Sequence, residues 1–243
     1  MSSATAQLAA MDVVDVCANC KQNRDCFLSQ RMPAETSGCV GIVQRRQALP
    51  PGTYLFRRNT PLRSIYLVSA GSIKTQRDTA DGELLVNGFY LGGDLVGIDA
   101  ISDGLHPCDA IATTDSEVCR IDFTRLMSEC ARRPELGSWV MAQISHYAKR
   151  RDDDLAWTAG LHAHSRVLRF FLDLHDRLTA QNDDLGDTAQ LPMRKQDIAR
   201  YLQMTPETLS RNLAALCRDG LLELHSDRFA LPDRSRARSV TQI

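Results

Sequence analysis

The sequence lacks the two features that mark exported and membrane-spanning proteins. Its first 16 residues contain neither lysine nor arginine, and no run of about 18 apolar residues occurs in the 243-residue chain. We therefore expect a soluble, cytoplasmic protein with no membrane partner. The chain also lacks an excess of charge, because its formal net charge is -1. A neutral balance does not exclude nucleic acid, since a local basic face is enough for binding.

Cysteine, in contrast, is abundant, with eight residues in the chain. Three of them, Cys17, Cys20 and Cys26, form a C-x2-C-x5-C pattern near the N-terminus. In a reducing compartment, clustered thiols indicate metal or redox chemistry rather than structural disulfides. A C-x2-C pair can bind one metal centre from a tight turn, and a four-thiolate site then needs Cys26 and one further sulfur. The spacing alone leaves zinc and an iron–sulfur cluster open.

A catalytic constellation is missing from the sequence. The six histidines show neither metal-ligand nor triad spacing. A C-x2-C oxidoreductase would carry its motif in a βαβ context beside a positioned base, whereas here the motif precedes a β-rich region. We therefore expect that the protein is not an enzyme.

Residues 50–130 have the pattern of a small barrel or jelly roll. Short runs rich in β-branched and aromatic residues alternate with turn glycines, and the pair Asp81-Gly82 predicts a hairpin. From residue 131 glycine becomes rare and apolar residues recur at helical spacing. That pattern predicts a long helix with one apolar stripe, which can pack on its own domain or on a second copy.

Residues 191–231 predict a winged helix-turn-helix. Thr205 is a good N-cap and Pro206 suits the first helical position. The second helix would present its N-terminal side chains to the major groove of DNA. There Arg211 can donate two hydrogen bonds to guanine, Glu207 can accept from cytosine and orient Arg211, and Ser210 can reach a base edge or phosphate. Candidates for backbone contacts are Arg194, Lys195, Arg200, Thr205 and Thr208. The alternative is a helical hairpin with a surface Glu207–Arg211 salt bridge.

Taken together, these features resemble the CRP/FNR family of bacterial transcription regulators, and the FNR branch in particular. The segments YLVSAGSIK, GFYLGGDLVGIDAI and TPETLSR carry the resemblance, which runs from Cys17 to about Leu231. It implies an α+β fold with a β-roll of the cyclic-nucleotide-binding jelly-roll type, a long dimerisation helix and a C-terminal winged helix-turn-helix. The boundaries expected are 1–40 for a cysteine-rich arm, 41–130 for the β-roll, 131–160 for the helix and 161–243 for the DNA-binding domain.

The resemblance also implies a cofactor and partners. FNR proteins hold an oxygen-labile [4Fe–4S] cluster, and the matching ligands here are Cys17, Cys20, Cys26 and, in the β-roll, Cys119. Their homodimers bind double-stranded DNA at inverted repeats with TTGAT-like half-sites through an E-x-x-S-R set, which Glu207, Ser210 and Arg211 match. They also contact RNA polymerase, for which a surface near Thr79–Leu85 is the counterpart.

Two alternatives use the same scaffold. One is a thiol-redox or zinc-stabilised regulator without an iron–sulfur cluster. The other is a cyclic-nucleotide receptor, which we do not expect because residues 105–112 offer Asp109 and no arginine to an anionic phosphate.

Some residues depart from the family pattern, and others have no place in it. Gln203 stands at a turn where family members often have glycine, so we expect strain in that turn. Arg194 stands where a threonine often caps the helix, which weakens that cap. We expect Cys130 and Cys217 to be buried small hydrophobes, Cys108 to be exposed and the tail 234–243 to be disordered. Cys39 is ambiguous.

Overall fold

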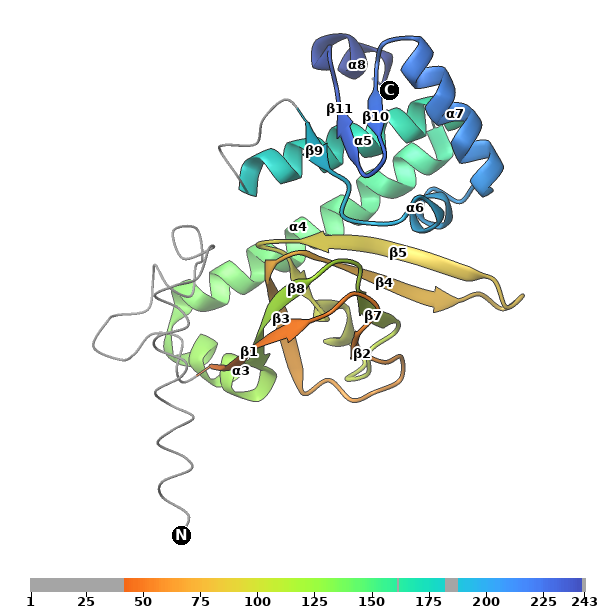
Figure 1. Cartoon of the computed structure of the whole chain (residues 1–243). Coiled ribbons are helices and arrows are strands. Elements are labelled where there is room, and N and C mark those ends of the chain that lie inside the picture. Colours follow the sequence, from red (N-terminus) through yellow and green to blue (C-terminus); the bar gives the residue numbers. More distant parts are fainter. Residues whose placement is uncertain (1–41, 161, 182–187, 242–243) are drawn as a thin grey trace. The chain divides into compact units, whose positions relative to one another are not determined.

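The computed structural model describes residues 42–160, 162–181 and 188–241 (Figure 1). The sequence predictions for Cys17, Cys20, Cys26 and Cys39 lie outside these residues. The chain divides into two compact units. The first runs up to Thr75 and continues over Phe89–Ile144, and the second comprises Gln76–Gly88 and the chain from Ser145 onward.

The β-rich region forms two four-stranded sheets, which confirms the expected jelly roll. Their strand orders are β1-β8-β3-β6 and β2-β7-β4-β5. Gly82 lies in the β4–β5 hairpin with a φ of 79°, a conformation that glycine adopts without a steric cost. The strands are β1 (Val43–Leu49), β2 (Tyr54–Phe56), β3 (Ser64–Ala70), β4 (Ser72–Asp78), β5 (Leu84–Leu91), β6 (Leu95–Val96), β7 (Asp109–Ala112) and β8 (Ser116–Asp122), with a 3-10 turn at Ile98–Ala100.

Strands β3 and β8 form the centre of the first unit. Ile65, Val68, Val118 and Ile121 on these strands are fully buried. Helix α3 (Phe123–Arg132) packs against both strands, which explains why β3 is apolar on both faces.

The long helix predicted after residue 131 is α4 (Pro134–Gly160). Its first turns bury Leu136 and Val140, whereas Met141 and Leu155 are 65% and 63% exposed. Met141 and Leu155 are two heptads apart along the helix, about four turns, so their side chains project from the same face. The apolar residues of α4 therefore divide between a buried part and a part that the described chain leaves uncovered.

The C-terminal region is a winged helix-turn-helix, as predicted. Helix α5 (Ala163–Gln181) supplies its core: the rings of Phe171 and Phe229 lie 5.1 Å apart, and those of Phe170 and Tyr201 lie 5.8 Å apart. The other elements are β9 (Ala189–Gln190), α6 (Lys195–Tyr201), α7 (Pro206–Arg218), β10 (Glu223–His225), β11 (Arg228–Ala230) and α8 (Arg234–Val240). Strands β10, β11 and β9 form the wing sheet in that order.

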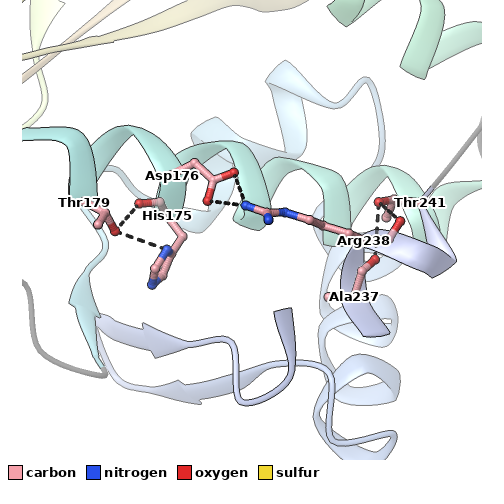
Figure 2. Close-up of polar contacts among 6 residues, drawn as sticks. All are labelled: His175, Asp176, Thr179, Ala237, Arg238 and Thr241. Carbon is pink, nitrogen blue, oxygen red and sulfur yellow. Dashed lines mark hydrogen bonds and ion pairs between the residues drawn. The ribbon is translucent and has the colours of Figure 1, made fainter. Parts of the chain in front are cut away.

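The prediction of a disordered tail is wrong, because the tail forms α8 on the surface of α5 (Figure 2). Asp233 caps α8 by accepting a hydrogen bond from the backbone N–H of Arg236 at 2.9 Å. The guanidinium of Arg238 donates to both carboxylate oxygens of Asp176 on α5, at 3.1 and 3.0 Å. Ala237 is fully buried, so this polar segment is held by a helix cap, an ion pair in which one guanidinium nitrogen donates to both carboxylate oxygens, and one small apolar side chain.

Three cysteine environments also differ from those predicted. Cys108 is buried, with its Sγ 3.6 Å from the carboxylate of Asp99, and Cys217 is exposed on α7. Cys130 is half-buried. Cys217 directly follows the buried Leu216, so the helical turn of about 100° per residue carries its side chain off the apolar face.

No helix in the described ranges is both long enough and apolar enough to cross a lipid bilayer.

Candidate nucleic-acid interface and thiol site

The two departures from the family pattern lie before and after α6. Arg194 occupies the N-cap of α6, and its side chain makes no capping hydrogen bond. Gln203 adopts a left-handed backbone with a φ of 53°, which costs a residue with a Cβ about 1 kcal/mol. Helix α6 therefore begins without a side-chain cap and is followed by a locally strained turn.

Helix α7 begins with a complete N-terminal cap. Thr205 accepts a hydrogen bond on Oγ1 from the backbone N–H of Thr208 at 3.2 Å, and Pro206 occupies the first turn. The leucines of α7 that face the core are Leu209, Leu213 and Leu216, and all three are buried. Burial of that face fixes which side chains of α7 point to solvent.

The predicted base-reading residues Glu207, Ser210 and Arg211 are all exposed, and they lie within the first two turns of α7. The guanidinium of Arg211 donates to Oγ1 of Thr208 at 3.3 Å, so Thr208 rather than Glu207 is its hydrogen-bond partner in the described chain. The pKa of Glu207 is lowered by its own backbone N–H at the helix N-terminus, then by Thr205, with a smaller contribution from Arg211. Glu207 is therefore a charged acceptor at neutral pH.

The candidates for phosphate contacts fall into two groups. Arg194 and Lys195 are exposed at the start of α6, where their charges can meet a phosphate. Arg200 already faces Asp197, with Nη1 3.8 Å from the carboxylate. The hydroxyls of Thr205 and Thr208 hydrogen-bond to each other at 3.1 Å. These threonines, which are also candidates for contacts with the DNA phosphates, therefore organise the N-terminus of α7.

A feature that the sequence patterns did not indicate is a hollow of about 450 Å³ beside α7. Lys195 of α6, Ser210 and Cys217 of α7 and Leu224 of β10 contribute to its lining. It joins residues that lie far apart in the sequence, so no local motif could have revealed it.

A partly buried carboxylate connects α4 to the helix-turn-helix. The hydroxyl of Tyr201 on α6 donates a hydrogen bond to Asp154 on α4, and Asp173 on α5 lies near both. Burial raises the pKa of Asp154, and the Tyr201 hydrogen bond with the charges of Arg150 and Arg151 opposes that shift. The pKa of Tyr201 is raised by burial and by Asp154, so its hydroxyl remains a donor.

Cys119 lies on β8, the strand between β1 and β3, and is 8% exposed. Its position is opposite Arg46 of β1 and Leu67 of β3. Across the ranges that the structure describes, no three histidine, cysteine, aspartate or glutamate residues gather as a metal site. The other three predicted ligands lie outside those ranges. A reduced thiol just below the surface and next to a cation fits a ligand of an anionic metal–sulfur centre.

The start of β7 and the loop before it bear on the cyclic-nucleotide alternative. The carboxylate of Asp109 accepts a hydrogen bond from the backbone N–H of Arg58 at 2.8 Å and lies 3.9 Å from Nη1 of Arg57. His106 is buried and stacks on Phe56 with ring centroids 3.7 Å apart. Burial lowers the pKa of His106, so this ring is neutral at pH 7 and gives no cation to a phosphate.

Two family models match the chain: a Crp-like helix-turn-helix domain over residues 165–238 and a Cyclic nucleotide-binding domain over residues 46–133. The Fumarate and nitrate reduction regulatory proteins of Escherichia coli (strain K12) and Salmonella typhi are each 32% identical to it over 206 residues, which cover 85% of the chain and 82% of the relative. The solved structure of FixK2 from Bradyrhizobium japonicum has a TM-score of 0.75 at 23% identity, and the match covers 82% of this chain and 98% of that chain.

We predict that Asp154→Asn raises the thermal stability of the winged helix-turn-helix at pH 7. The amide oxygen still accepts from Tyr201, while the cost of a partly buried charge disappears. Because the pKa of Asp154 is raised in the fold, the wild-type carboxyl stabilises most when protonated, and that stability is lost as pH rises through the raised pKa. The advantage of the variant should therefore shrink as pH falls towards 4.

Thermal melting followed by circular dichroism over this pH range checks the prediction. Asp153→Asn is the matched control, since Asp153 forms a surface ion pair with Lys149 at 2.8 Å and should give little change. A lower melting temperature for Asp154→Asn at pH 7 would mean that the attraction of Arg150 and Arg151 outweighs burial.

Proposed function

Since the chain belongs to the CRP/FNR family of transcription regulators, we propose that it is an oxygen-responsive regulator. It holds a [4Fe–4S] cluster and, as a homodimer, binds inverted-repeat DNA with TTGAT-like half-sites. The observation that carries the DNA-binding part is the exposed set Glu207, Ser210 and Arg211 at the N-terminus of α7. The matched regulators that support the oxygen-responsive part are named for fumarate and nitrate reduction.

The geometry of α7 supports direct reading of bases in the major groove. A recognition helix contacts base edges with its N-terminal residues, and Arg211 can pair with O6 and N7 of a guanine. Thr208 restricts the Arg211 side chain before binding, which reduces the entropy lost on contact. Glu207 is charged at neutral pH and can accept from N4 of the paired cytosine.

A two-fold dimer would place two such helices about one turn of DNA apart, roughly 34 Å. The exposed Met141 and Leu155 on one face of α4 support pairing of this helix with a second copy. Neither side chain is covered by the described part of its own chain, so association would remove both from water.

We assign the ligands of the cluster to Cys17, Cys20, Cys26 and Cys119. When bound, the cluster supplies an anionic, redox-active centre that oxygen can dismantle. Cys119 would tie the N-terminal arm to a strand that is paired on both sides. A ligand that favours the DNA-binding dimer shifts the population of dimers by its difference in affinity for the two states.

Further partners follow from the same family. The proposed contact with RNA polymerase is the β4–β5 hairpin. There the backbone N–H of Thr79 donates to the carbonyl of Glu83 at 2.8 Å, and Oγ1 of Thr79 accepts from the backbone N–H of Glu83 at 3.1 Å. We place the protein in the cytoplasm, where a regulator meets the chromosome.

Cyclic-nucleotide binding is a second candidate, because a Cyclic nucleotide-binding domain model matches residues 46–133. The chemistry of this segment argues against it, because neither the carboxylate of Asp109 nor the neutral ring of His106 supplies a cation to an anionic phosphate. A zinc-stabilised or thiol-redox regulator would keep the fold and the DNA interface and would differ in its metal content and colour.

We predict that Arg211→Gln costs about 1–3 kcal/mol of affinity for the specific site and leaves non-specific binding almost unchanged. Lys195→Gln should weaken binding to both kinds of DNA and reduce the salt dependence by about one counterion. Fluorescence anisotropy at several salt concentrations measures both effects.

Arg218→Gln is the matched control, because this substitution removes the same charge at the opposite end of α7. An equal loss for Arg211→Gln on specific and random DNA would contradict base reading by this helix.

We also predict that DNA binding depends on oxygen. Anaerobic protein should bind the inverted repeat, and air should abolish binding along with the dimer, since both require the intact cluster. Cys119→Ala should remove anaerobic binding, whereas the control Cys130→Ala should behave as wild type because Cys130 is a half-buried residue of α3. Mobility-shift assays with parallel size-exclusion chromatography check this. Equal binding by the aerobic and anaerobic protein would contradict the proposed control.

A further inference from the structure

Arg46 lies directly opposite Cys119 in the β1–β8 ladder. Residues that oppose each other in an antiparallel pair project from the same face, with Cβ atoms about 4.5–5.5 Å apart. The stem of the Arg46 side chain therefore starts beside the Cys119 thiol. Glu117 lies two residues before Cys119 on β8, so alternation brings it to the same face.

The guanidinium of Arg46 is held but incompletely satisfied. Its Nη2 forms an ion pair with the carboxylate of Glu117. Its Nε is buried and has no hydrogen-bond partner among the described residues. A buried N–H without an acceptor costs about 1–3 kcal/mol, so an acceptor that the described chain lacks is expected near this atom. The sulfur atoms of a cluster bound at Cys119 would supply such an acceptor.

We propose that Arg46 is a positioning residue for the iron–sulfur cluster: its Nε donates a hydrogen bond to a cluster sulfur, and its positive charge slows oxidation of the cluster. This inference rests on the proposed function, because it requires Cys119 to be a ligand. It adds a role for a residue outside the ligand set, and it makes Glu117 the residue that moderates the charge of Arg46.

The physical basis is electrostatic. Oxidation by air removes one electron from the cluster and adds it to dioxygen, which becomes superoxide. The cluster with its thiolates is anionic, and a fixed cation nearby stabilises the state that keeps the electron. Arg46 therefore opposes electron loss, whereas the carboxylate of Glu117 favours it. Partial burial of the pair limits screening by water, since the Arg46 side chain is only 20% exposed.

Arg120 provides a matched control on the same strand. It follows Cys119 directly and so projects from the opposite face of β8, where its Nε donates to Oγ of Ser64 at 3.0 Å. Removing its charge changes the net charge of the protein as much as removing that of Arg46. The two substitutions therefore differ in the face of the sheet from which the charge is removed.

The experiment compares full-length wild type with Arg46→Gln, Glu117→Gln and Arg120→Gln. Each protein is reconstituted anaerobically with iron and sulfide and mixed with air-saturated buffer, and loss of the visible band is followed by stopped flow. We expect the bleaching rate to rise severalfold for Arg46→Gln, to fall for Glu117→Gln and to stay unchanged for Arg120→Gln. Arg46→Lys keeps the charge without the Nε donor and should lie between wild type and Arg46→Gln.

The opposite signs separate electrostatic control from a structural role. Breaking the Arg46–Glu117 pair from either side loosens the same contact, so a merely structural pair would make both variants bleach faster. That result, or equal rates for Arg46→Gln and Arg120→Gln, would overturn the proposal while the cluster itself stands. If Arg46→Gln fails to take up the cluster, slower bleaching of Glu117→Gln than of wild type still shows that a negative charge at this place speeds oxidation. A wild type that never gains colour would overturn this inference and the proposed function together.

Discussion

Strand β8 is held on both sides by antiparallel ladders, and this fixes the face on which Cys119 projects. A slip of one residue in either ladder would exchange every side chain between the two faces of the sheet. The buried Val118 makes such a slip costly, because in one direction the charged Glu117 would take its place in the core. The surroundings of Cys119 therefore depend on how neighbouring residues of β8 pack in the core.

The same logic applies to the DNA-facing helix. Burial of Leu209, Leu213 and Leu216 orients α7, and the exposed polar set at its N-terminus follows from that orientation. The hydrogen bond from Tyr201 to Asp154 adds a directional link between α6 and α4. Because a hydrogen bond weakens steeply with misalignment, displacement of α4 at Asp154 would be felt by the helix-turn-helix. That link gives the proposed dimer helix a physical route to the residues that read DNA.

Local chemistry made much of this fold predictable from the sequence. The Asp81-Gly82 pair predicted the β4–β5 hairpin, Thr205 with Pro206 predicted the start of α7, and the absence of glycine at Gln203 predicted a strained turn. The failures concern contacts between distant residues. Helix α8 depends on Arg238 meeting Asp176, and the burial of Cys108 depends on the packing of the β-roll. The Thr208–Arg211 contact was missed because two side chains, Glu207 and Thr208, lie within reach of the same guanidinium.

The absorption spectrum of protein purified without oxygen, followed during exposure to air, tests the central claim most directly. The account predicts a broad band at roughly 400–420 nm, as a thiolate-held cluster gives, which bleaches in air. Replacing any one of Cys17, Cys20, Cys26 and Cys119 by alanine should remove this band. A colourless wild-type protein after anaerobic reconstitution with iron and sulfide would contradict the account, and a winged-helix regulator controlled by other means would remain.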